Sequence, residues 1–146
     1  MGFADSVRKT ASKQLEQVDK RIESMAVELF TAAVDLSPAQ PAAQYAKGQF
    51  INNWRAVVNG DTSDTTKSLS MTGEASRESI SQIKGSKTFL GKDAFVTLTN
   101  NLPYAGLVEY VGWPQSINPR WINKVGPYAP VRNAFTKVMP KYKVKQ

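Results

Sequence analysis

The chain has 146 residues, of which 41% are hydrophobic and 21% are charged, and these proportions are ordinary for one globular domain. It contains no cysteine and no histidine, which excludes disulfide bridges, thiolate chemistry, histidine-based hydrolytic triads and typical zinc sites. No apolar run reaches the length of a membrane span and the N-terminus lacks the apolar core of a secretory signal, so we expect no membrane partner.

The net charge of +7 is unevenly distributed along the chain. Residues 1–37 contain five basic and six acidic residues, whereas residues 110–146 contain basic residues and no acidic one. A surface of one sign attracts DNA or acidic proteins, although a basic tail can also serve only to keep a protein in solution. The residues that we consider for contact with DNA or an acidic partner are Arg120, Lys124, Lys137, Lys141, Lys143 and Lys145.

The first predicted element is one long helix over residues 4–36, within a helical segment 1–37. Asp5 or Ser6 could cap its start, and Pro38 ends it, because the residue before a proline avoids helical geometry. Apolar residues recur every three or four positions, close to a heptad repeat. This stripe consists of Val7, Ala11, Leu15, Val18, Ile22, Met25, Leu29, Ala33 and Leu36.

Such a helix spans about 50 Å, which is longer than a small domain can cover. We therefore expect part of the stripe to pack on another subunit, although it could instead be buried within the chain. The residues expected at this interface are Leu15, Val18, Ile22 and Leu29, together with Trp121 in a later loop.

The middle of the chain is predicted to alternate strands, loops and a helix. Residues 49–58 have the composition of a strand, and residues 61–73 are polar enough to form an exposed, mobile loop. A helix is expected over residues 74–84, with Thr72 as a candidate cap. One or two strands should follow over residues 88–99.

Residues 96–113 are predicted to form a strand, a corner at Pro103 and a short helix. Tyr104, Leu107, Val108 and Val111 recur at helical spacing after the corner. We expect this helix to cover the sheet, so that Trp54, Leu107 and Tyr110 share one core.

The rest of the chain should contain a loop or arm over residues 112–130, a helix or strand over 130–139, and a basic tail over 140–146. The predicted fold is therefore α+β in a single domain, 1–146. In it the long N-terminal helix packs on a small, mainly antiparallel sheet, with one crossing helix and a short C-terminal element.

The residues that could carry catalysis are scattered carboxylates. Asp61 and Asp64 share a loop, but they have no further ligands and are only a weak indication of calcium binding. The segment 85–87, Gly-Ser-Lys, lacks the other glycine of a phosphate-binding loop. We therefore predict no catalytic, cofactor or metal site, and a protein that is not an enzyme.

Three segments carry a resemblance to a known family. Residues 100–113, NNLPYAGLVEYVGW, resemble the signature of bacteriophage neck, or tail-completion, proteins. Residues 34–38, followed by Gly48 and Trp54, resemble an upstream segment of the same minor tail component family, and residues 128–135 resemble its last element. The chain departs from the family pattern at residues 37–41 and by an extra valine at position 111.

The resemblance implies a structural virion protein that joins head to tail, or completes the tail, as part of a homo-oligomeric ring around the DNA channel. Sixfold or twelvefold symmetry is implied. The implied partners are a connector or head-completion protein, a tail terminator or tail tube, and DNA in the channel. The implied location is the virion, after assembly in the host cytoplasm. The alternative prediction, from charge and aromatic residues alone, is a small basic nucleic-acid-binding module.

Overall fold

The computed structural model describes residues 2–41, 45–84, 95–111, 113–114, 124–125 and 127–142. The elements are α1 (Phe3–Asp35), β1 (Trp54–Val58), α2 (Glu74–Ser81), β2 (Val96–Asn100), the π-helix η2 (Leu107–Val111), β3 (Trp113–Pro114), β4 (Lys124–Val125), α3 (Pro130–Val138) and the 3-10 helix η4 (Met139–Tyr142). The predicted α+β class is confirmed, with its long N-terminal helix, antiparallel sheet and short C-terminal helix.

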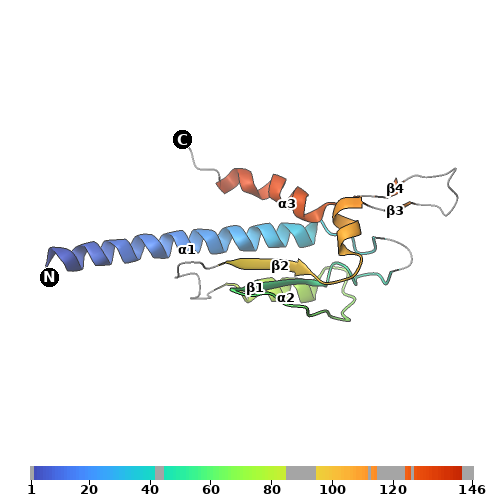
Figure 1. Ribbon diagram of the computed structural model, residues 1–146, viewed down its shortest axis with the longest axis horizontal. Coiled ribbons are helices and arrows are strands. Elements are labelled where there is room, and N and C mark those ends of the chain that lie inside the picture. Colours follow the sequence, from blue (N-terminus) through green and yellow to red (C-terminus); the bar gives the residue numbers. More distant parts are fainter. Residues whose placement is uncertain are drawn as a thin grey trace.

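Helix α1 is divided into two halves by its surroundings. Its C-terminal half lies between α3 and the β1–β2 sheet, and its N-terminal half projects beyond every other labelled element (Figure 1). The helix begins after Gly2, which makes no side-chain cap, so the prediction of a cap by Asp5 or Ser6 is wrong. Its end was predicted correctly to within one residue, and Ser37 there donates its hydroxyl to Ala33 O at 2.6 Å.

The strand predicted over residues 49–58 is shorter in the structure, because residues 47–52 form turns. The side-chain amides of Asn52 and Asn53 donate to Gly48 O at 2.8 Å and Gln49 O at 2.6 Å. Such local side-chain bonds compete with a strand ladder. β1 therefore starts at Trp54 and pairs with β2 in antiparallel register, from Trp54 opposite Asn100 to Val58 opposite Val96.

Helix α2 runs along the edge of β1. The hydroxyls of Ser76 and Ser79 each accept a hydrogen bond at 2.9 Å, from the backbone N–H groups of Trp54 and Ala56 respectively. Alternate N–H groups of an antiparallel strand point away from its partner strand, so these two would otherwise be unpaired. α2 thus closes one edge of the sheet.

The start of α2 differs from the prediction. Its N-cap is Gly73, with φ 75°, and not Thr72. A Cβ atom at Gly73 would lie 2.9 Å from Val34 Cγ1 and 3.0 Å from Ile51 Cγ1, so both the backbone conformation and the packing require glycine. The helix ends at Ser81 rather than at residue 84, and residues 85–94, including the first part of the predicted strand region, lie outside the described residues.

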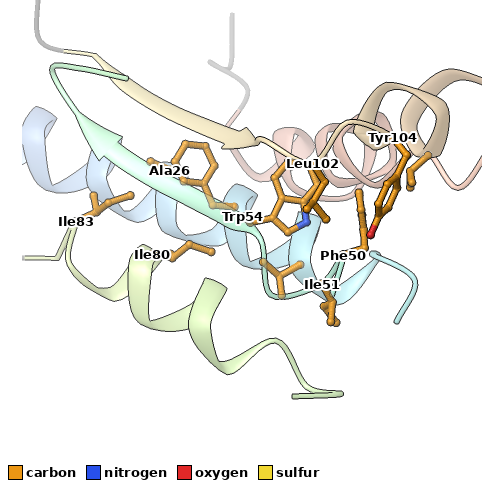
Figure 2. Packing of buried hydrophobic residues seen from close by; sticks show 11 residues of the cluster. Ala26, Phe50, Ile51, Trp54, Ile80, Ile83, Leu102 and Tyr104 are labelled. Carbon is orange, nitrogen blue, oxygen red and sulfur yellow. The ribbon is translucent and has the colours of Figure 1, made fainter. Parts of the chain in front are cut away.

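The core joins α1, β1, α2 and the corner after β2 (Figure 2). Its members are Ala26, Phe30, Val34, Phe50, Ile51, Trp54, Ile80, Ile83, Leu102, Tyr104 and Val108. The prediction that Leu107 and Tyr110 belong to this core is wrong, since their side chains are 40% and 68% exposed. Residues 107–111 form a π-helix, in which Val108 and Glu109 are buried and Val108 is the apolar residue that joins the core.

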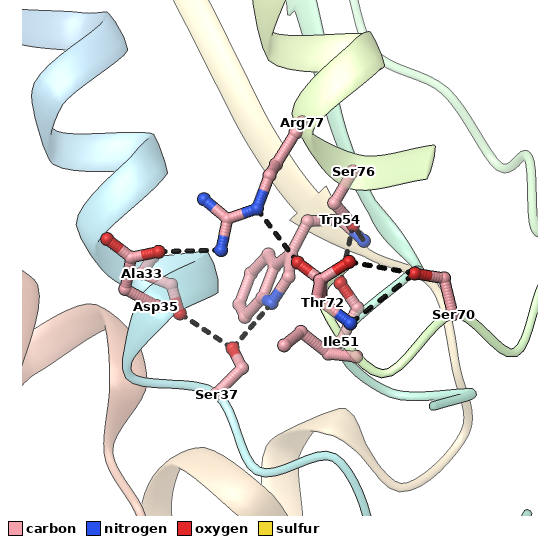
Figure 3. Close-up of polar contacts among 9 residues, drawn as sticks. All are labelled: Ala33, Asp35, Ser37, Ile51, Trp54, Ser70, Thr72, Ser76 and Arg77. Atoms are coloured by element: carbon pink, nitrogen blue, oxygen red, sulfur yellow. Dashed lines mark hydrogen bonds and ion pairs between the residues drawn. The ribbon is translucent and has the colours of Figure 1, made fainter. Parts of the chain in front are cut away.

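Trp54 also links three elements through polar bonds (Figure 3). Its indole N–H donates to Ser37 Oγ at 2.8 Å, just after α1, and its backbone N–H donates to Ser76 in α2. Ser76 Oγ in turn donates to Ile51 O at 2.7 Å. These groups are buried, so the bonds satisfy polar atoms that water cannot reach.

The loop over residues 61–73 is irregular, as predicted, and side chains of other segments bind its backbone. Asn53 Oδ1 accepts from Thr66 N at 2.8 Å, while the Asn101 amide donates to Thr62 O at 2.9 Å and Asp64 O at 3.0 Å. Gly48 lies so close to Leu69 that an added Cβ would be 2.2 Å from its carbonyl oxygen. The loop therefore lies on the turn before β1.

The prediction for the fold concerns Ser76→Ala. This change leaves the N–H of Trp54 and the carbonyl of Ile51 buried without a partner, and we expect it to lower the free energy of unfolding by at least about 1–3 kcal/mol. Urea denaturation measures the change. Ser81→Ala, in the exposed last turn of the same helix, is the control and should change stability by less than about 0.5 kcal/mol. Equal effects of the two substitutions would contradict this role of Ser76.

Candidate assembly surface

The N-terminal half of α1 presents the apolar stripe to solvent. Every residue from Gly2 to Val18 is exposed. Of the predicted interface residues, Leu15 is 61% exposed, Val18 53% and Ile22 40%. Leu29 differs from these three, because it is partly buried against both hydrophobic clusters of the fold. The stripe thus passes from solvent into the body of the protein between Ile22 and Leu29.

Where the stripe enters the body, it forms the floor of an apolar groove of about 140 Å³. α1 contributes Leu29, Phe30 and Ala33 to the lining, β2 contributes Leu98, and α3 contributes Val131, Ala134 and Phe135. Seven apolar side chains and no charged one line this hollow. We refer to it below as the α1–α3 groove.

Glu109 fixes α3, one wall of the groove, in place. α3 begins at Pro130 after Ala129, which has no side chain that could cap it. Instead, the buried Glu109 carboxylate accepts hydrogen bonds from Val131 N at 3.0 Å and Arg132 N at 3.1 Å. A carboxylate at this position satisfies unpaired N–H groups and complements the helix dipole. Arg132 reinforces the contact, since its Nε lies 3.1 Å from Glu109 Oε1.

The end of the chain is fastened to α1 through Glu28. Lys141 Nζ lies 3.3 Å from Glu28 Oε2, and the Tyr142 hydroxyl donates to Glu28 Oε1 at 2.9 Å. The Arg21 guanidinium lies 5.8 Å from the centre of the Tyr142 ring. Residues 141–142 therefore belong to the folded body, which corrects the prediction of a basic tail that starts at residue 140.

The other predicted contact residues are spread over the last quarter of the chain. Arg120, Trp121, Lys143 and Lys145 lie outside the described residues, and so does most of the predicted arm over 112–130. Lys124 belongs to β4, which pairs with β3, but its side chain is not described. Lys137 is exposed in the last turn of α3. Of the six basic residues, Lys137 and Lys141 are the two whose side chains are described, and they lie in α3 and η4.

Phe135 is a surface residue at the edge of the α1–α3 groove that the sequence analysis did not single out. Val131, Ala134 and Val138 form the inner face of α3, and Phe135 lies at the edge of that face with 47% of its surface exposed. A helix of nine residues with four apolar positions leaves one of them at the margin, but the sequence alone does not show which. The position of Phe135 at the groove is the feature that was missed.

Other classes of site find no support in the described residues. They contain no group of three or more acidic side chains that could hold a metal ion. Within the same residues, no helix has both the length and the apolar character needed to cross a membrane. Comparison of the chain with protein-family models, with curated proteins and with solved structures gave no match.

The first prediction for this surface concerns the support of α3. Glu109→Ala leaves two backbone N–H groups at the start of α3 without an acceptor, and we expect a loss of about 1–3 kcal/mol in the free energy of unfolding. Denaturant titration measures it. Glu78→Ala, an exposed glutamate in α2, is the matched control and should change stability by no more than about 0.5 kcal/mol. An unchanged midpoint for Glu109→Ala would contradict the assigned support.

A second prediction concerns acid. The hydrogen bond from Tyr142, followed by Lys141, lowers the pKa of Glu28 below its usual 4.5. A carboxylate with a lowered pKa contributes stability above its unfolded pKa and loses it as pH falls through its folded pKa. We therefore expect η4 to detach from α1 as the pH falls below 4.5.

Hydrogen exchange at Met139–Tyr142, corrected for the intrinsic pH dependence, measures this detachment. Glu28→Gln should abolish the pH dependence, whereas Glu16→Gln, an exposed glutamate elsewhere on α1, should leave it unchanged. Protection of η4 that stays constant down to pH 3 in the unsubstituted protein would be inconsistent with the role of Glu28.

Proposed function

We propose that this chain is a structural subunit of a bacteriophage neck, where it forms part of the ring that joins the head to the tail or completes the tail. The observation that carries the proposal is the projecting half of α1, whose apolar stripe has side chains 40% to 61% exposed at Ile22, Val18 and Leu15. A subunit built for assembly has such a surface, whereas a monomeric protein rarely exposes a continuous apolar stripe.

The physical argument begins with the instability of single helices. An isolated helix of about 15 residues is marginal in water, and packing of its apolar face supplies most helical stability in proteins. Residues 2–18 have no such packing within the described chain. Contact with another subunit would provide it, and a ring requires contacts in which one face of each subunit meets a different face of the next.

The resemblance to neck proteins supports the proposal from a second direction. The residues that carry it have defined structural roles: Leu102 and Tyr104 are buried in the core, and the Asn100 amide donates to Phe50 O at 3.1 Å. The matching segment is therefore the corner that connects β2 to the core. A similar segment in another protein would suit a similar corner.

The alternative of a nucleic-acid-binding module has less support from the described residues. Only Lys137 and Lys141 of the proposed basic set have described side chains, and Lys141 is paired with Glu28. The two functions differ in their response to salt, because each phosphate contact weakens binding as salt rises.

The test of the proposed function is co-expression with the products of the genes adjacent to its own. We expect a ring of six or twelve copies by native mass spectrometry, and co-purification with a connector or tail protein that persists in high salt. A monomer or dimer with strong, salt-sensitive affinity for DNA and no affinity for those proteins would overturn the proposal.

A variant prediction follows from the stripe. Leu15→Asp together with Ile22→Asp places charges on the exposed apolar face, and we expect a folded monomer that no longer forms the ring. Circular dichroism reports folding, and sedimentation velocity reports assembly. Gln17→Asp together with Ser24→Asp introduces the same residues on the opposite, exposed face of α1 and should assemble normally. Normal assembly of the stripe variant would remove the stripe from the interface.

A further inference from the structure

The apolar stripe and the α1–α3 groove lie on one face of the same helix. At about 100° per residue, Ala11, Leu15, Ile22, Leu29 and Ala33 fall within about 40° of one another around the α1 axis. The first three lie along the projecting half, and the last two form the floor of the groove. One molecule thus carries an uncovered apolar helix and, further along the same line, an apolar hollow with walls on both sides.

From this arrangement we infer that the stripe of one copy, residues 11–22, packs against the mouth of the α1–α3 groove of the next copy and inserts an apolar side chain into it. The occupant is a second copy of this chain, bound head to tail. This inference deepens the proposed function. It rests on that function for the head-to-tail geometry, since a ring needs contacts between two different faces of the subunit. An amphipathic helix in an apolar groove is a recurrent mode of recognition.

The projecting half of α1 offers apolar surface that a neighbouring copy can cover. Every residue from Gly2 to Val18 is exposed, and Leu15, Val18 and Ile22 expose 61%, 53% and 40% of their surface. These side chains are the part of the helix that the groove of a neighbour would contact.

Charge favours the head-to-tail arrangement over a two-fold pair. Consider two α1 helices that pack antiparallel about a two-fold axis near Ile22. Asp19 of one copy would then lie on the same side as Asp19 of the other, and Arg21 likewise beside Arg21. Like charges at such positions oppose association. In a head-to-tail contact, Glu16 and Asp19 on one flank of the stripe can instead face α3. α3 exposes Lys137 and contains no acidic residue.

Phe135 provides the means to block the groove without disturbing the core. It lines the hollow, yet 47% of its surface is exposed, so Phe135→Asp should leave the monomer folded. Thr136→Asp, on the exposed side of the same helix, is the matched control. The variant with Leu15→Asp and Ile22→Asp has an intact groove and a damaged stripe. The Phe135→Asp variant has an intact stripe and a damaged groove.

The deciding experiment mixes these two variants and measures mass by sedimentation velocity or native mass spectrometry. Each variant alone should be monomeric, and the controls should assemble like the unsubstituted protein. The equimolar mixture should form a 1:1 heterodimer and nothing larger, because it contains one intact stripe and one intact groove that can meet. A mixture that stays monomeric, or an unsubstituted protein that stops at a two-fold dimer, would overturn the inference.

Crosslinking provides a second measurement that does not depend on charged substitutions. The chain has no cysteine, so Leu15→Cys or Ile22→Cys in one copy can be oxidised against Phe135→Cys in another. Each copy then carries a single cysteine, so a disulfide bridge can form only between two copies. At least one pair should give a covalent heterodimer, and the absence of both, with folded proteins, would count against the contact.

The inference and the proposed function can be separated by their failures. If the mixture forms the heterodimer but the oligomer does not bind connector or tail proteins, the contact stands and the neck function is wrong. If the ring forms and joins its partners while the mixture stays monomeric, the neck function stands and the helix-in-groove contact is wrong.

Discussion

The fold depends on Trp54, which is held at two points by serine hydroxyls. Ser37 accepts from its indole N–H at the end of α1, and Ser76 accepts from its backbone N–H at the edge of the sheet. The ring itself is buried among side chains of α1 and α2. Because the Trp54 ring is buried and both of its N–H groups are hydrogen-bonded, it fixes the direction of α1 relative to the sheet. The projecting half of α1 therefore has a defined orientation.

Sequence patterns predicted the elements whose stability is local. The stripe of α1 and the stop at Pro38 gave its extent, because helix period and proline geometry act over a few residues. The β2 strand and the corner after it were also predicted. The predicted strand was wrong over residues 49–53, which form turns, since Asn52 and Asn53 bind the backbone of a preceding turn and of a loop that lies 13 or more residues away. No periodicity reports such bonds.

Part of the candidate surface was predictable from the period and length of α1. Leu15, Val18 and Ile22 were identified because a helix of this length exceeds what a small sheet can cover. The groove could not be identified, because its walls come from β2 and α3, and α3 is held by Glu109 from 22 residues earlier. Val108, rather than Leu107 or Tyr110, faces the core for a related reason: the π-helical turn changes which residues lie inward.

The rigidity of both surfaces bears on how assembly would proceed. The stripe lies on a helix that is continuous with a buried segment, so the helix is already nucleated and contact with a neighbour supplies the packing that its exposed part lacks. The groove is held open between α1 and α3 by the bonds of Glu109 to the start of α3. A contact between two formed surfaces avoids the ordering cost that a disordered arm would incur. Its strength then depends on how well apolar side chains fill the hollow, and Phe135 at the margin is the largest residue positioned to complete that packing.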